Sequence, residues 1–139
     1  MDDDLKRLNE RTHKSWEANA EGWDTKMAEG NGFFRELIWP STERLLCLTE
    51  GSRVLDAACG NGTAARRMSA LGAEVSAFDF SAGLVERARA RGEGGITYAV
   101  GDATDVDFLS KFGDGAYDAV HSSSVLAEYS SRRHGSCSR

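Results

Sequence analysis

The second half of the sequence alternates strand-like and helical patterns, and this alternation constrains the fold more than any other feature. Short apolar runs are separated by amphipathic segments in the order RVLDAA, TAARRMSALG, AEVSAFDF, AGLVERARARG, GITYAV, DVDFLSKFG and AYDAVHSSS. Such alternation is typical of α/β proteins with a parallel sheet. Right-handed crossovers place ligands outside the carboxyl ends of the strands. We therefore expect an α/β fold with a binding site at that edge.

The two ends of the chain differ from this pattern. Residues 1–50 show helical spacing, as in Leu5, Leu8, Thr12 and Trp16, and no strand signal. The glycines of EGWDTKMAEGNG are expected to interrupt the first helix, and a later helix is expected between Pro40 and Gly51. We predict an N-terminal helical cap over 1–50, a cofactor-binding domain over 51–126 and a disordered or aberrant serine-rich tail over 127–139.

Composition excludes several classes of function. The net charge of −5 does not favour binding to nucleic acid or to an anionic membrane. No apolar run reaches the ~18 residues of a membrane span, and the acidic N-terminus is unlike a targeting peptide. Three cysteines, an odd number without metal-type spacing, indicate reduced thiols, a cytoplasmic location and no metal site.

A glycine-rich turn follows the first predicted strand. Gly60 and Gly62 would let the backbone approach a ligand, and the helix that follows would offer free N–H groups. The segment GNGTAA also matches the dinucleotide fingerprint G-x-G-x-x-G/A of NAD-binding domains. However, Asp56 lies just ahead of these glycines, and a carboxylate repels pyrophosphate while it attracts an ammonium or sulfonium group. A cationic nucleoside is therefore favoured, and NAD remains the weaker alternative.

Three acidic residues lie at the ends of successive predicted strands. Asp56 ends the first apolar run, Asp79 ends the second, and Asp102 follows the third. Carboxyl ends of parallel strands meet at one edge, so we expect the three carboxylates to lie there together. Asp79 is placed to bind ribose hydroxyls.

These motifs together resemble those of class I S-adenosylmethionine-dependent methyltransferases. The segment VLDAACGNG resembles their motif I, VSAFDFS their ribose-binding strand, VGDAT their adenine-binding segment and YDAVHSSSVL their fourth strand. The resemblance extends from Gly51 to Leu126, and WEANAEGWDTKM is similar to the cap of members that act on small molecules. A Rossmann-like fold and S-adenosyl-L-methionine as cofactor are what the resemblance implies.

The resemblance also implies a role for residues of the first two strand ends. Asp56, Gly60 and Gly62 would hold the methionine part of the cofactor, with Asp56 near its amino group. Asp79 would bind the ribose hydroxyls, and Phe80 would lie beside the adenine.

Further roles fall on the later strands and on the cap. Asp102 would accept a hydrogen bond from the adenine amino group, and Ala103 would donate its backbone N–H to the ring. His121 and Ser122 would lie near the transferable methyl group, with His121 a candidate general base. Trp23, with Trp16 and Asp24, lies where a lid would be, and Trp23 is a candidate substrate contact. Buried packing of the N-terminal helices is the alternative and is favoured for Trp16.

The implied function is methyl transfer to a small-molecule acceptor at an oxygen, carbon or nitrogen atom. Members of the family carry seven strands, whereas this sequence has four strand signals, so we expect an incomplete, truncated sheet in the order 3-2-1-4. The fourth strand would then lie at an edge, where its unpaired backbone favours self-association. The alternative is a non-catalytic remnant that binds the cofactor or a partner chain.

Overall fold

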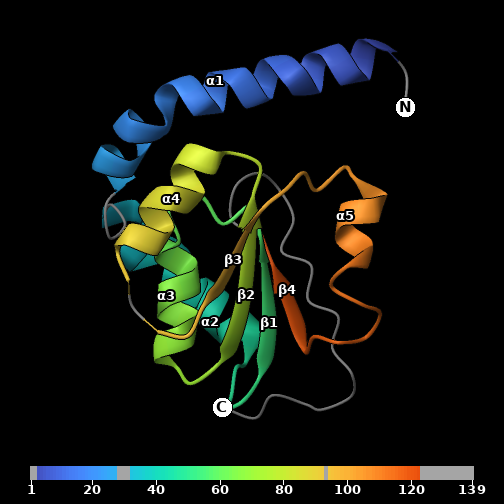
Figure 1. The fold of residues 1–139 in the computed structure, drawn as a ribbon. Helices are drawn as coiled ribbons and strands as arrows, with labels where there is room; N and C mark the ends of the chain where they lie inside the picture. Colours follow the sequence, from blue (N-terminus) through green and yellow to red (C-terminus); the bar gives the residue numbers. More distant parts are fainter. Residues whose placement is uncertain (1–2, 28–31, 93, 123–139) are drawn as a thin grey trace.

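The computed structural model describes residues 3–27, 32–92 and 94–122, and it is built around a parallel sheet (Figure 1). The strands are β1 (Arg53–Ala57), β2 (Glu74–Asp79), β3 (Thr97–Val100) and β4 (Ala119–His121). They pair in parallel in the order β3-β2-β1-β4, which confirms the order predicted from the sequence.

Helices connect the strands as the alternation predicts. They are α3 (Thr63–Ala70), α4 (Ala82–Ala90) and the short α5 (Val106–Ser110). In Figure 1, α3 and α4 lie on one side of the sheet and α5 lies on the other. Phe78 packs towards α5, because its ring lies 5.1 Å from that of Phe108 between centroids. The two faces of the sheet are therefore both covered by helices.

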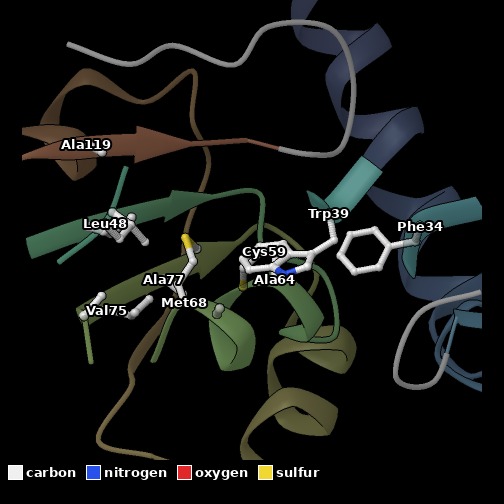
Figure 2. Packing of buried hydrophobic residues seen from close by; sticks show 12 residues of the cluster. Phe34, Trp39, Leu48, Cys59, Ala64, Met68, Val75, Ala77 and Ala119 are labelled. Carbon is white, nitrogen blue, oxygen red and sulfur yellow. The ribbon is translucent and has the colours of Figure 1, made fainter. Parts of the chain in front are cut away.

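The main hydrophobic core lies on the α3 face of the sheet. Val54 and Val75 are register partners in β1 and β2, and both belong to one buried cluster with Met68 of α3. Figure 2 shows Val75 and Met68 in this cluster. Ala64 and Ala65 are also buried there, and their small side chains let α3 approach the strands closely. Figure 2 shows that Trp39 extends this core towards the N-terminal segment.

The N-terminal part is helical, but its helix boundaries differ from the prediction. Helix α1 (Asp3–Met27) passes through Gly22 and ends at Met27, inside the segment expected to interrupt it, so the expectation fails only at Gly22. A glycine inside a helix costs about 1 kcal/mol relative to alanine, which is an amount that tertiary contacts readily offset. The chain resumes in a π-helical turn, η1 (Phe34–Ile38), and in α2 (Trp39–Leu46).

Helix α2 also corrects the predicted end of the second helical segment. Pro40 lies in the first turn of α2, where its missing N–H costs nothing, rather than ahead of the helix. The helix ends at Leu46 and not at Gly51, and its C-cap residue Cys47 has a left-handed φ of 48°. Of the cysteines expected to be reduced, Cys59 is a free, buried thiol.

Two further expectations concern the membrane and the tail. Within the described ranges, no helix has both the length and the apolar character that a bilayer span requires. The predicted tail at 127–139 lies outside the described residues and stays a prediction.

Candidate functional site

A cavity of about 480 Å³ lies at the carboxyl ends of β1, β2 and β3 and is lined on another side by residues of α1. Its volume is in the ordinary range for small-molecule sites, and its position is the one that the parallel sheet predicts. The sheet side contributes residues from the loops that follow three strands, namely Gly60, Asn61, Asp79, Phe80, Asp102 and Ala103. The helical side contributes several aromatic residues, namely Trp16, Trp23, Phe33 and Phe34.

The glycine loop between β1 and α3 has one glycine that opens onto the cavity. Gly60 has a φ of 56°, and a side chain there would meet only Trp23 Nε1, at 3.9 Å, so the backbone is open to a ligand. Gly62 serves a different purpose. It has a φ of 82°, and a Cβ atom there would lie 2.5 Å from Tyr98 Oη and 2.9 Å from Arg66 Nη1. Gly62 is thus required by conformation and packing, and it does not line the cavity.

Asp79 joins the glycine loop to the end of β2. Its Oδ2 accepts a hydrogen bond from the Gly60 backbone N–H and its Oδ1 accepts one from the Ser81 N–H, both at 2.9 Å. The pKa of this carboxyl is raised, mainly by burial. The two N–H groups lower the pKa, whereas the negative charges of Asp56 and Glu17 raise it further. A carboxylate has about four acceptor positions, so further positions remain for hydroxyl groups of a ligand.

Asp102 lies just beyond β3 and is held by α1 as well as by its own loop. Its Oδ1 accepts hydrogen bonds from the backbone N–H and the hydroxyl of Thr104, both at 2.8 Å, and its Oδ2 accepts one from Asn9 of α1. Burial alone would raise the pKa of Asp102, but these hydrogen bonds and the nearby His13 outweigh it and lower the pKa. The group therefore stays a carboxylate at neutral pH.

Asp56 occupies a different position from the other two strand-end acids. It is fully buried and does not line the cavity. Its Oδ1 lies 2.8 Å from Nδ1 of the buried His121, its neighbour in the register of β1 and β4. Its Oδ2 has no hydrogen-bond partner among the described residues. The structure thus pairs Asp56 with His121 and does not bring it to the cavity.

The predicted site residues therefore fall into two groups. Those that line one cavity are Trp23, Gly60, Asp79, Phe80, Asp102 and Ala103. Those that lie outside its lining are Asp56, Gly62, His121 and Ser122. Cys59 lines the cavity, but burial, together with the charges of Asp56 and Asp79, raises the pKa of its thiol, which leaves it a poor nucleophile.

Sequence reasoning named Trp16 as a lid residue but did not assign Asn9, Thr12 or His13 to the site. Asn9, Thr12 and Trp16 line the cavity, and the ring of His13 lies 5.3 Å from that of Phe80. These residues recur at three- and four-residue steps, so helical spacing was the available signal. The helical spacing seen in the sequence placed Thr12 and Trp16 in one stripe with Leu5 and Leu8, and these two leucines are both more than half exposed. A mixed polar and aromatic stripe carries little hydrophobic signal, which is why it was not recognised.

Comparison with known proteins extends the description beyond geometry. The sequence profile of a family described as "Methyltransferase domain" matches residues 54–136. A demethylmenaquinone methyltransferase of Clavibacter sepedonicus is 36% identical over 100 residues, which cover 70% of this chain and 38% of the relative. A demethylmenaquinone methyltransferase of Parafrankia is 49% identical over 51 residues, which cover 37% of this chain and 20% of the relative. The chain spans less than half the length of these curated relatives.

Solved structures are also similar to this chain. The DhpI-SAM-HEP complex matches with a TM-score of 0.62 and 25% identity, covering 83% of this chain and 50% of that one. An S-adenosylmethionine-dependent methyltransferase of Mesorhizobium loti matches with a TM-score of 0.51 and 33% identity. The match covers 60% of this chain and 37% of that one.

Proposed function

Because the chain belongs to the methyltransferase domain family, we propose that its cavity binds S-adenosylmethionine and that the protein transfers the methyl group to a small-molecule acceptor. The observation that carries the proposal is the convergence of the Gly60 backbone, Asp79 and Asp102 on one cavity. Two carboxylates beside an open glycine suit a nucleoside with a positively charged tail. The cofactor named in the DhpI-SAM-HEP complex is of this kind.

The residues present fit this cofactor. Asp79 would accept from the ribose hydroxyls with the acceptor positions that Gly60 and Ser81 leave free. Asp102 and Ala103 would hold the adenine, with Phe80 beside it. The space in front of Gly60, which a Cβ atom would partly fill, would take the amino-acid end of the cofactor. We retain Asp56, Gly62 and Ser122 as predicted contacts, although they lie outside the cavity lining.

The chain itself needs little acid–base chemistry for this reaction. S-adenosylmethionine supplies a methyl group already activated by the positive sulfonium. The protein's residues bind and orient the two reactants and exclude water from the space between them. The aromatic side chains of the cavity help to exclude water, because they enclose it with apolar surface. They are Trp16, Trp23, Phe33 and Phe34. His121 is buried against Asp56 and is thus not positioned for general-base catalysis in this arrangement.

The acceptor is proposed to be apolar or aromatic. Phe33, Phe34 and Ile38 line the cavity on the side of η1, and they join Trp16 and Trp23 of α1 in one apolar wall. Apolar walls with few polar groups are typical of sites for small organic molecules. An aromatic acceptor of the kind named in the demethylmenaquinone methyltransferases would suit this wall.

A second candidate function is binding without catalysis. Methyl transfer needs a bound acceptor as well as the cofactor, and the polar groups that converge on the cavity, the Gly60 backbone, Asp79 and Asp102, are assigned to the cofactor alone. A module of this kind would bind S-adenosylmethionine without turning over any acceptor. A methylation assay against a panel of quinols, phenols and amines distinguishes the two functions.

Isothermal titration calorimetry tests the cofactor. The protein is expected to bind S-adenosylmethionine and S-adenosylhomocysteine, and the Asp79→Ala variant is expected to lose at least about tenfold in affinity for both, because hydrogen bonds to charged groups are worth roughly 1.5–3 kcal/mol. Asp114→Ala, a change at an exposed residue, serves as the matched control. Binding of NAD in place of both ligands would overturn the proposal.

A further inference from the structure

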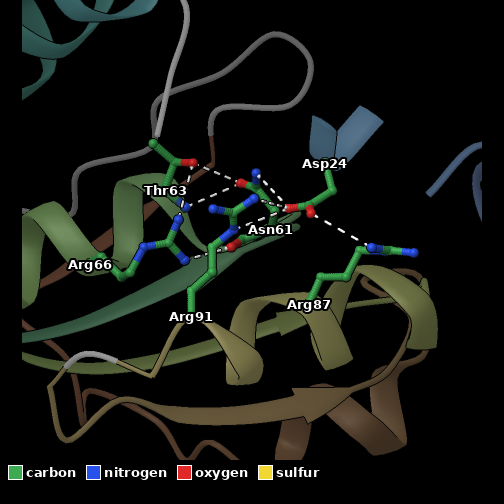
Figure 3. Close-up of polar contacts among 6 residues, drawn as sticks. All are labelled: Asp24, Asn61, Thr63, Arg66, Arg87 and Arg91. Carbon is green, nitrogen blue, oxygen red and sulfur yellow. Dashed lines mark hydrogen bonds and ion pairs between the residues drawn. The ribbon is translucent and has the colours of Figure 1, made fainter. Parts of the chain in front are cut away.

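A buried carboxylate near the end of α1 collects donors from two other parts of the molecule (Figure 3). Asp24 Oδ1 accepts hydrogen bonds from Arg91 Nη2 at 2.9 Å and from Arg91 Nε at 3.2 Å. The same oxygen accepts one from Asn61 Nδ2 at 3.2 Å. Arg87 Nη1 lies 3.7 Å from Asp24 Oδ2. One side chain of α1 thus contacts α4, through Arg87 and the C-cap residue Arg91, and also contacts the glycine loop, through Asn61.

The contact to Asn61 fixes which way its amide faces. The Nδ2 group donates to Asp24, so Oδ1 is turned towards α3, where it accepts from the Thr63 hydroxyl at 2.7 Å and from the Thr63 N–H at 3.3 Å. A reversed amide would place two acceptors against each other at Asp24. Because Asn61 lies between Gly60 and Gly62, its anchoring also restrains the conformation of the loop.

The same turn of α1 holds an aromatic wall of the cavity. Trp23 precedes Asp24, and its Nε1 faces the open side of Gly60. Its ring packs edge-on against Trp16, with centroids 5.2 Å apart. Close packing of α1 on α4 supports this placement, because a Cβ atom at Gly83 would lie 3.2 Å from Cβ of Ala20. Displacement of Asp24 would therefore move Trp23 away from the loop.

We propose that Asp24 is a positioning residue of the cofactor site, whose carboxylate sets Asn61 and Trp23 around the amino-acid end of the bound cofactor. The inference rests on the proposed function, since it assumes that S-adenosylmethionine occupies the cavity. The proposal confines the effect of Asp24 to one end of the cofactor. Asn61 and Trp23 lie at the glycine loop, whereas Asp79, Phe80 and Asp102 would take the nucleoside. Asp24 therefore acts on one end of the cofactor and not on the other.

The test compares two ligands by calorimetry on the full chain. S-adenosylhomocysteine contains the amino-acid end, and adenosine lacks it. Asp24→Asn is expected to raise the dissociation constant for S-adenosylhomocysteine roughly tenfold. The dissociation constant for adenosine is expected to stay within about threefold of that of the unmodified protein. Arg91→Gln removes the same contact from the other partner and gives a second variant if Asp24→Asn does not fold. Glu21→Gln is the matched control, because Glu21 also lies near Arg87, at 3.9 Å, but is exposed.

A second measurement needs no ligand. Amide hydrogen exchange at Gly62 and Thr63 is expected to accelerate in Asp24→Asn and to stay unchanged in Glu21→Gln, because the loop has lost its anchor. Equal losses for both ligands, or unchanged exchange, would overturn the positioning role. If the unmodified protein binds S-adenosylhomocysteine no better than NAD, the proposed function itself fails, whatever the exchange shows. The two failures are thus distinguishable.

Discussion

At the scale of single residues, two glycines of one loop have separate duties. Gly60 is open to the cavity, whereas Gly62 is enclosed by Tyr98, Arg66 and Ala88. Both have positive φ, so alanine at either position carries a conformational cost of about 1 kcal/mol. Beyond that shared cost, a side chain at position 60 would take space from the ligand, whereas a side chain at position 62 would overlap packed neighbours and lower the stability of the fold.

Alanine substitutions should separate these duties. Gly60→Ala is expected to lose affinity for S-adenosylhomocysteine at least tenfold, with a decrease of roughly 1 kcal/mol in the free energy of unfolding. Gly62→Ala is expected to lower that free energy by more than 2 kcal/mol, because its methyl group would overlap Tyr98 and Arg66. Urea denaturation and calorimetry measure the two effects. Equal effects of the two variants on stability would contradict this assignment.

At the scale of elements, α3 is the helix that joins the loop to the core. Met68 is fully buried beneath the sheet, whereas Leu71, at the C-terminal cap of the same helix, is more than a third exposed. The glycine loop begins this helix, so packing along α3 also fixes the position of the loop.

Truncation of Met68 tests how far α3 depends on this packing. Met68→Ala is expected to lower the free energy of unfolding by about 2–5 kcal/mol, because it leaves a cavity in a buried core. Leu71→Ala is the control and should cost less than about 1 kcal/mol, since much of its side chain already contacts water. Thermal and urea unfolding report both values, and a similar loss in the two variants would contradict the proposed role of Met68.

Features that depend on a local sequence pattern were predictable, whereas features that depend on contacts between distant residues were not. The order of the strands, the connecting helices and the family follow from the alternating pattern and from the motifs, and they are confirmed. The cap at Ser81 is confirmed too, since its hydroxyl accepts from the Leu84 N–H. The course of α1 through Gly22 was not predictable, because the contacts of Asp24 that accompany it come from residues 61, 87 and 91. The pairing of Asp56 with His121 likewise depends on strand register and not on spacing.

At the scale of the whole molecule, β4 forms one edge of the sheet among the described residues. Among the described residues, β4 pairs with β1 and with no other strand. A parallel edge strand presents backbone groups that can pair with another chain. We propose that the chain self-associates through this edge, as the sequence analysis expects.

Sedimentation velocity measures this association. The weight-average sedimentation coefficient is expected to rise with protein concentration, and Val120→Lys should reduce the rise, because a lysine at an edge strand opposes pairing. Circular dichroism verifies that the variant keeps its fold. A concentration-independent monomer would refute the proposal.

The hydrogen bond from Gly60 to Asp79 has a consequence for attempts to change what the protein binds. Exchanging the acid at the end of the second strand is an obvious way to alter nucleotide preference, since that side chain faces the sugar. In this protein the same carboxylate also closes the glycine loop, so the exchange would release the backbone at the opposite end of the ligand. Redesign of cofactor preference would therefore need compensating changes at position 60 or 61, and single substitutions at position 79 should yield inactive proteins and not proteins of altered preference.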